Sequence, residues 1–437
     1  MSDSLNLNVD QLFFLALDFK KNNLLGAKKI MQQALYLSDD KDGPVKNNLK
    51  KIQNELIAKI NANRISFKED GNEIFLFAPH LLPTEISSHK FLYLAWVQRL
   101  HRIFPNKKIR FFITHEGGHS NPEFNKNFFD EHLTELERNK FSIQAFPRYL
   151  TDLIDYSYWV SHAIDKKPYF SLFFETVETV KNNHVIKFVR EEGPVMSVHC
   201  SPKLPINDLV DITFVGQEAR THENNNAKFL PVIIDEKRDF NFNFIIPSKN
   251  KKRKIVVTAF TNKRIIKNLK KNEILIDKII NFLQKNEVEW HFIGHETKED
   301  YFELDRRFLT LEEKLLFLPI TNQLSEHFSQ SDVYAYLPGF HGGDSGTRMA
   351  VEQKIPCLAM KDEAGGYIKY ATHQHACDSI DEYFEKLEIL LEDKNYSNKV
   401  ISDQSHYLLS LKSNENEVFF ERFLEDACLN FKKRKYL

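Results

Sequence analysis

The sequence predicts an α/β protein with two Rossmann-like domains and a helical extension at its N-terminal end. Short apolar segments rich in β-branched and aromatic residues alternate with helix-length segments, which is typical of a parallel sheet covered by helices. This alternation occurs twice, and a polar, basic stretch near residues 236–254 separates the two series. The chain has 437 residues, which also favours two domains, because single cores rarely grow beyond about 250–300 residues.

Four regions are expected from these patterns. A helical extension covers residues 1–64, an N-terminal Rossmann-like domain 65–240, a C-terminal Rossmann-like domain 241–391, and a helical region 392–437. In the first region, apolar residues recur at steps of four and three after Pro44, on one face of a helix. They are Val45, Leu49, Ile52, Leu56 and Ile60. With the amphipathic segment 22–37 they resemble one tetratricopeptide-like hairpin that can bind a protein partner, or else form a helical cap on the next domain.

Each Rossmann-like region carries its own series of expected strands. In the first region these are residues 73–79, 108–114 and 168–174, followed by 185–189 and 195–199, which we expect to form a hairpin around REEGP. In the second region they are 254–260, 289–294, 314–319, 332–338 and 355–360. Residues 265–286 and 347–354 are expected helices of the second series.

Composition limits the cellular setting and the partners. Hydrophobic residues make up 42% and charged residues 28%, as in a globular protein, and the net charge of -1 provides no global field for nucleic acid. Two basic runs, 248–254 and 431–435, can contact a polyanion or an anionic membrane surface, or form a solvated linker and a frayed tail. Four distant cysteines predict neither disulfides nor a zinc site. With no secretory signal or membrane-length apolar run, we expect a cytoplasmic protein, peripheral at most to the inner membrane face.

A glycine-rich loop, HGGDSGT at 341–347, is the main candidate site. Glycine is scarce, 14 of 437 residues, yet Gly342, Gly343 and Gly346 fall within five positions. The loop follows an expected strand and precedes an expected helix, where backbone N–H groups can bind an anion. Asp344, Ser345, Gly346 and Thr347 can cap this helix. Glu352, eight positions after Asp344, can address the same cleft and accept bonds from a ribose. An ordinary glycine turn with a helix cap is the alternative.

Residues 254–391 resemble the C-terminal, donor-binding domain of GT-B glycosyltransferases, in which two Rossmann-like domains face a cleft. Many retaining members carry a Glu-x7-Glu pattern before a strand that begins with a small residue and proline; here Asp344-x7-Glu352 precedes KIPCLAM. The resemblance implies that Glu352 binds the donor ribose and that Asp344 faces the sugar, with a reach one methylene shorter than Glu. It also implies that the loop from His341 through Gly342, Gly343, Ser345, Gly346 and Thr347 binds the donor diphosphate.

Basic and imidazole groups complete the expected site. Lys263 and Arg264 follow the first strand of the second series, where related enzymes place cations against the departing diphosphate, so that no metal or other cofactor is required. In an inverting enzyme, a histidine or a carboxylate of the first domain can deprotonate the acceptor hydroxyl. His80 is the chosen candidate, with His89, His115 and His162 as further ones, whereas His341 adjoins the glycine loop of the second domain. HEGGH at 115–119 is no zinc-protease motif, because two glycines weaken the helix that such a motif requires. EAGGY at 363–367 either closes over the donor or is a turn.

The resulting expectation is a metal-independent, retaining glycosyltransferase of GT-B architecture. It would use a nucleotide sugar, with UDP as the expected nucleotide, and a glycan, lipid-linked or protein acceptor. Two alternatives stay open: a nucleotide-sugar 2-epimerase of the same fold, and a catalytically inactive binding or scaffold protein. A nicotinamide oxidoreductase is disfavoured, because no GxGxxG follows an early strand.

Overall fold

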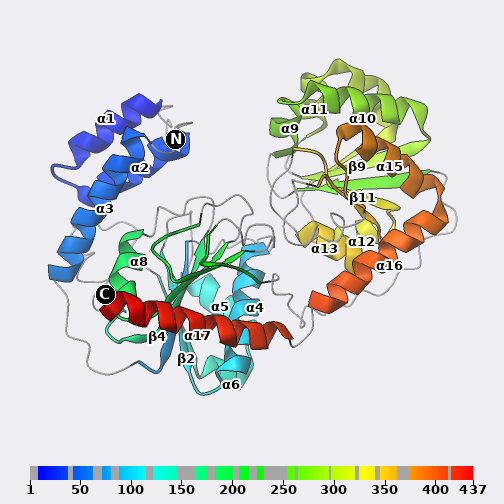
Figure 1. Ribbon diagram of the computed structural model, residues 1–437. Helices are drawn as coiled ribbons and strands as arrows, with labels where there is room; N and C mark the ends of the chain where they lie inside the picture. The colour runs from blue at the N-terminus through cyan, green and yellow to red at the C-terminus, as the bar shows by residue number, and fades with distance from the viewer. Residues whose placement is uncertain are drawn as a thin grey trace.

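The computed structural model contains two parallel sheets, each covered by helices, and a helical N-terminal extension (Figure 1). It describes residues 8–37, 43–62, 71–79, 88–114, 122–145, 163–175, 183–199, 206–215, 224–230, 253–260, 264–294, 297–319, 324–339, 345–361, 375–411 and 415–436. The predicted α/β class is therefore confirmed, and every strand pair within the two sheets is parallel.

In its described residues, the extension consists of the helices α1 (Val9–Phe19), α2 (Leu24–Leu37) and α3 (Pro44–Ala62). Asn8 caps α1 through a capping box with Gln11. The predicted apolar face of α3 is buried at Val45, Leu49, Ile52 and Leu56. The side chain of Ile60 is not among those that the structure describes. This face joins one apolar cluster with the first sheet and the helix α8 (Asn183–Arg190), so the extension packs on the domain that follows it.

The first sheet has the strand order β3-β2-β1-β4-β5-β6-β7. Its strands are β1 (Glu73–Ala78), β2 (Lys108–Ile113), β3 (Phe141–Ala145), β4 (Pro168–Glu175), β5 (Val195–His199), β6 (Ile212–Val215) and β7 (Ala227–Phe229). The connecting helices described, besides α8, are α4 (Ser88–Ile103), α5 (Pro122–His132) and α6 (Glu135–Arg138). Aromatic rings fill the centre: Phe77 stacks on Phe173 at 4.3 Å and on Phe112 at 4.9 Å between ring centroids.

The expected hairpin of residues 185–189 and 195–199 is wrong. Residues 185–189 lie in α8, and β5 pairs in parallel with β4. The apolar run suggested a strand, but its buried members, Val185, Ile186, Phe188 and Val189, have helical spacing, with Lys187 only partly buried between them. Gly193 and Pro194 then end the helical segment, so the short connection links a helix to a parallel strand.

The second sheet has the order β10-β9-β8-β11-β12. Its strands are β8 (Lys254–Ala259), β9 (Val288–Gly294), β10 (Leu315–Pro319), β11 (Val333–Ala335) and β12 (Cys357–Leu358). The helices of this half are α9 (Arg264–Leu269), α10 (Glu273–Lys285), α11 (Lys298–Leu304), the 3-10 helix η2 (Arg306–Lys314), α12 (Leu324–Ser329), α13 (Ser345–Glu352), α15 (Ile380–Glu392) and α16 (Lys394–Leu411). All five expected strands occur, but β12 is much shorter than residues 355–360. The single helix expected at 265–286 is two, because Asn272 caps a new helix by accepting from the Leu275 N–H.

The last helix, α17 (Glu415–Tyr436), returns to the first sheet (Figure 1). Phe420, Leu424 and Ala427 are buried in the same cluster as Trp96 and Phe214. The basic run 431–435 is therefore part of a packed helix rather than a frayed tail, and Arg434 forms an ion pair with buried Asp211. In the other run, residues 248–252 lie outside the description.

Candidate donor site at the second sheet

The strand order of the second sheet reverses direction between β8 and β11. From β8 the chain first adds β9 and β10 on one side, then β11 and β12 on the other. The connections that leave the carboxyl ends of β8 and β11 therefore diverge to opposite sides, which makes this the topological switch point at which doubly wound sheets bind ligands. The Lys263-Arg264 pair follows β8, and the glycine loop follows β11.

Hydrogen bonds hold these two strand ends together. The Thr258 hydroxyl donates to the Ala335 carbonyl at 2.8 Å and accepts from the Trp290 indole at 3.1 Å. The Tyr334 hydroxyl donates to the Ala259 carbonyl at 3.3 Å. On the loop side, Asn268 of α9 donates to the carbonyl of Gly339 at 3.0 Å. Gly339 has a φ of 87°, a conformation that favours glycine, so the residue type at this position permits the turn.

The helix α13 begins at Ser345, directly after the glycine-rich residues, and packs against α12, α16 and β12. At Gly346, a side-chain Cβ would be only 2.6 Å from the Tyr334 hydroxyl oxygen. Tyr334 is 1% exposed and its ring cannot move aside easily. Glycine at this position therefore permits the first turn of α13 to approach the end of the sheet.

Three polar side chains of α13 distinguish it from an ordinary core helix. Thr347 is fully buried, and its hydroxyl has no hydrogen-bond partner within the described residues. Buried hydroxyls are normally paired, so this group is a candidate ligand contact. Glu352, with a 14% exposed side chain, accepts a bond from the Arg348 Nε at 2.8 Å. Arg348 was not predicted as a site residue, although its spacing of four residues from Glu352 on one helix was a readable signal.

β12 and α16 support the other side of α13. The Gln404 side chain accepts from the Cys357 N–H at 3.0 Å and donates to the Cys357 carbonyl at 2.8 Å. The Cys357 thiol donates to the Thr347 carbonyl at 3.6 Å. Complete burial raises the pKa of this thiol well above its usual value, so Cys357 is a packing group rather than a nucleophile.

The structure describes only part of the predicted site. Gly346, Thr347 and Glu352 lie together on α13, and Arg264 and Ser345 are the first residues of α9 and α13, with undescribed side chains. Asp344, Lys263, His80, His341, Gly342 and Gly343 lie outside the described residues, as do His115, His162, the HEGGH segment and EAGGY. His89 lies in α4 with its side chain undescribed. Among the described residues, no group of three or more His, Cys, Asp or Glu side chains is placed to hold a metal ion.

Comparison with solved structures confirms the GT-B architecture. The Thermobaculum terrenum O-GlcNAc transferase aligns over 97% of this chain and 92% of its own, with a TM-score of 0.53 and 10% identity. The lipopolysaccharide outer core galactosyltransferase WaaB aligns over 80% and 99%, with a TM-score of 0.55 and 12% identity. Anabaena HepE in complex with UDP aligns over 80% and 100%, with a TM-score of 0.53 and 12% identity. No protein-family model and no curated protein sequence matches the chain.

Proposed function

We propose that this protein is a glycosyltransferase that binds a nucleotide sugar at the carboxyl ends of β8 and β11. The observation that carries the proposal is the reversal of strand order between these two strands. The helix α13, which carries Thr347 and Glu352, follows β11 in the chain. A UDP-sugar is the proposed donor, and the similar fold of HepE, solved with UDP, supports this nucleotide. The acceptor is a glycan, a lipid-linked glycan or a protein.

The proposed chemistry depends on stabilising the leaving nucleoside diphosphate. Its negative charge grows as the bond to the sugar breaks, and fixed cations and N–H dipoles can stabilise that charge without a metal ion. We assign this role to the N–H groups at the start of α13 and to Lys263 and Arg264, while Glu352 accepts bonds from the ribose hydroxyls. Asp344 faces the sugar and its developing positive charge, as in the retaining enzymes that the sequence resembles. His80 is the proposed base if transfer proceeds with inversion.

The proposed setting is the cytoplasm, with contact at the inner membrane face where the acceptor is lipid-linked. No helix within the described residues is long and apolar enough to cross a membrane. The helices α1–α3 pack on the first domain and are proposed to recruit a protein partner or acceptor.

A panel of nucleotide sugars incubated with the purified protein and cell-extract acceptors tests the proposal. Mass spectrometry should detect transfer or slow hydrolysis of one donor, undiminished by EDTA, and NMR of the product should show a retained anomeric configuration. Loss of activity in EDTA would refute the metal-free mechanism, and an inverted product would move the catalytic role from Asp344 to a base such as His80. An epimerised donor without acceptor would identify a 2-epimerase, and absence of binding to every donor would favour a scaffold protein.

The variant Asp344→Asn separates chemistry from binding. It should lower kcat by about 100-fold or more, because an electrostatic contact to the transition state is lost, while the affinity for UDP stays within about twofold. Equal losses in kcat and in UDP affinity would place Asp344 at the nucleotide instead.

A further inference from the structure

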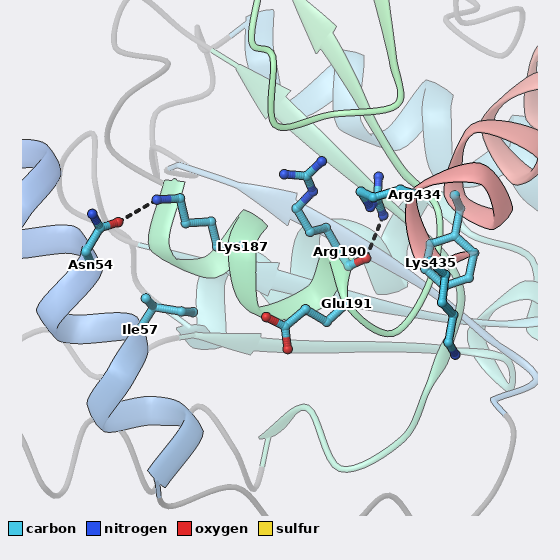
Figure 2. A pocket seen from close by; sticks show the side chains of 8 residues that line it. Asn54, Ile57, Lys187, Arg190, Glu191, Arg434 and Lys435 are labelled. Carbon is cyan, nitrogen blue, oxygen red and sulfur yellow. Dashed lines mark hydrogen bonds between the residues drawn. The ribbon is translucent and has the colours of Figure 1, made fainter. Parts of the chain in front are cut away.

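A pocket of about 520 Å³ lies away from the second sheet, where α3, α8 and α17 meet (Figure 2). Its lining residues are Asn54, Ile57, Lys187, Arg190, Glu191, Phe431, Arg434 and Lys435. These three helices belong to distant parts of the sequence, so the pocket exists only in the folded chain. Its volume lies within the range of about 300–1,000 Å³ typical of small-molecule sites.

The lining carries four cationic side chains and one carboxylate. Lys187 and Arg190 project from the same helix, and in Figure 2 they extend away from the Glu191 carboxylate. Burial, followed by repulsion from Arg190 and Lys50, lowers the pKa of Lys187. Burial and repulsion from Arg434 likewise lower the pKa of Arg190, against the opposite effects of Asp211 and Glu191. The repulsion, although smaller than the effect of burial, places like charges close together, and the lining has four cations against one carboxylate.

Hydrogen bonds to neighbouring residues hold these cationic side chains in place, and at least one of their N–H donors is left over. The Lys187 ammonium donates to the Asn54 amide oxygen at 2.5 Å, and Arg434 donates to the Arg190 carbonyl at 2.6 Å. Arg434 is also held by Asp211, which is 4% exposed and accepts from the Val195 N–H at 2.8 Å. The Arg190 Nε is buried and has no hydrogen-bond partner in the described part of the chain. A buried guanidinium donor without a partner is costly unless an anion completes it.

The geometry points to a second anion site, and we propose that this pocket binds the phosphate group of a phosphorylated organic ligand. Guanidinium groups match phosphate oxygens through paired N–H donors, and a lysine adds a point charge. Phe431 and Ile57 are half-buried and give the pocket apolar walls for the organic part attached to the phosphate. The ligand is either a soluble phosphate ester or the headgroup of an anionic phospholipid; both present the same chemistry to these residues.

Calorimetry and vesicle flotation with the full-length protein distinguish the two sources. Inorganic phosphate and glycerol 3-phosphate serve as soluble probes, and phosphatidylcholine vesicles with and without phosphatidylglycerol serve as membrane probes. The double variant Lys187→Gln/Arg190→Gln should weaken binding of the active probe about tenfold or more, as expected for loss of charge-assisted bonds. Because this variant also removes the bond to Asn54, Asn54→Asp provides a second test: Asn54 is exposed, and the new carboxylate would neutralise Lys187 and exclude the anion.

The matched control is Lys432→Gln/Lys433→Gln, which removes two exposed charges from the same basic run outside the pocket. This control should change the affinity for the active probe by less than about twofold, because exposed charges outside the pocket are screened by salt. If the wild-type protein and the control bind the soluble phosphate ester but the pocket variants do not, the ligand is a soluble ester. If the same difference is seen with vesicles and not with the soluble probes, the ligand is the lipid headgroup. The proposal is overturned if no probe binds the wild-type protein, or if the control weakens binding as much as the pocket variants. UDP titrations of all three variants should be unchanged, so the outcome is independent of the donor site.

Discussion

The two sheets share the strand order of their first five strands, but different side chains occupy their centres. In the first sheet, stacked rings of Phe77, Phe112 and Phe173 fill the positions around β1. In the second, hydroxyls of Thr258 and Tyr334 link β8, β9 and β11 close to the reversal point. The topology offers a crevice in both halves. The contrast is one of proportion, because the Thr114 hydroxyl also donates to the Ala78 carbonyl at the end of β1, and Phe292 stacks on Trp290 in β9. More rings fill the centre of the first sheet, and more hydroxyl bonds link the central strands of the second.

Removing one ring from the first half should have the largest effect. Phe77→Ala deletes a fully buried side chain from the stack, and should lower the free energy of unfolding by about 3–5 kcal/mol. UDP affinity at a temperature where the protein stays folded should be unchanged. Urea denaturation and calorimetry check the two quantities, and a loss of UDP affinity in the folded variant would show that the two halves are coupled.

Filling the gap at Gly346 should affect both stability and binding. In Gly346→Ala the new Cβ meets the Tyr334 hydroxyl oxygen at 2.6 Å, which should cost about 1–3 kcal/mol and displace the first turn of α13. UDP affinity should fall with it. The double variant Gly346→Ala/Tyr334→Phe removes that oxygen and should recover part of the loss, with Tyr334→Phe alone as the control. Without any recovery, the contact with Tyr334 would not be the reason for glycine here.

The buried hydroxyl of Thr347 provides a test that is specific to binding. Thr347→Val keeps the shape but removes a hydroxyl that has no partner in the described structure, so stability should change by less than about 1 kcal/mol. UDP affinity should fall about tenfold if the hydroxyl contacts the diphosphate, and Thr347→Ser should retain it. A marked loss of stability with unchanged affinity would assign the hydroxyl to the fold.

The smallest expected effect is a pH dependence confined to the first half. Burial lowers the pKa of His101 below its ordinary value of 6.5, with Glu137 raising it and Lys140 lowering it to lesser extents. The unfolded chain therefore binds this proton at a higher pH than the folded chain does. As pH falls below 6.5, the free energy of unfolding should decline with a slope of up to about 1.4 kcal/mol per pH unit from this one group. His101→Gln should flatten that part of the profile in urea denaturation, and an unchanged profile would exclude His101 as its source.

The strands of the second half could be located from sequence, because each is a compact apolar run followed by a helix. In the first half, β3, β6 and β7 were missed. They are short, and β3 alternates partly buried and exposed residues at the sheet edge. The run in α8 was assigned to a strand, because four apolar residues within five positions obscure the helical period.

The candidate site was predictable where it depends on local spacing and not where it depends on distant contacts. The position of Glu352 on a helix after the glycine loop follows from the order of segments. The contact of Gly346 with Tyr334 and the bond from Trp290 to Thr258 join different strands and helices, and no sequence period reveals them. The same is true of the second pocket, since Arg434 meets Asp211 across 223 residues.

Isothermal titration of UDP tests the central claim most directly, with wild-type protein, Glu352→Gln and the control Glu385→Gln. Glu385 is an exposed carboxylate on α15, so its change should leave binding intact. The donor-site account predicts one UDP per chain for the wild-type protein and an affinity lower by about 10-fold or more in Glu352→Gln, because bonds from the ribose to a charged acceptor are lost. Equal affinity in all three proteins, or no UDP binding by the wild-type protein, would contradict it.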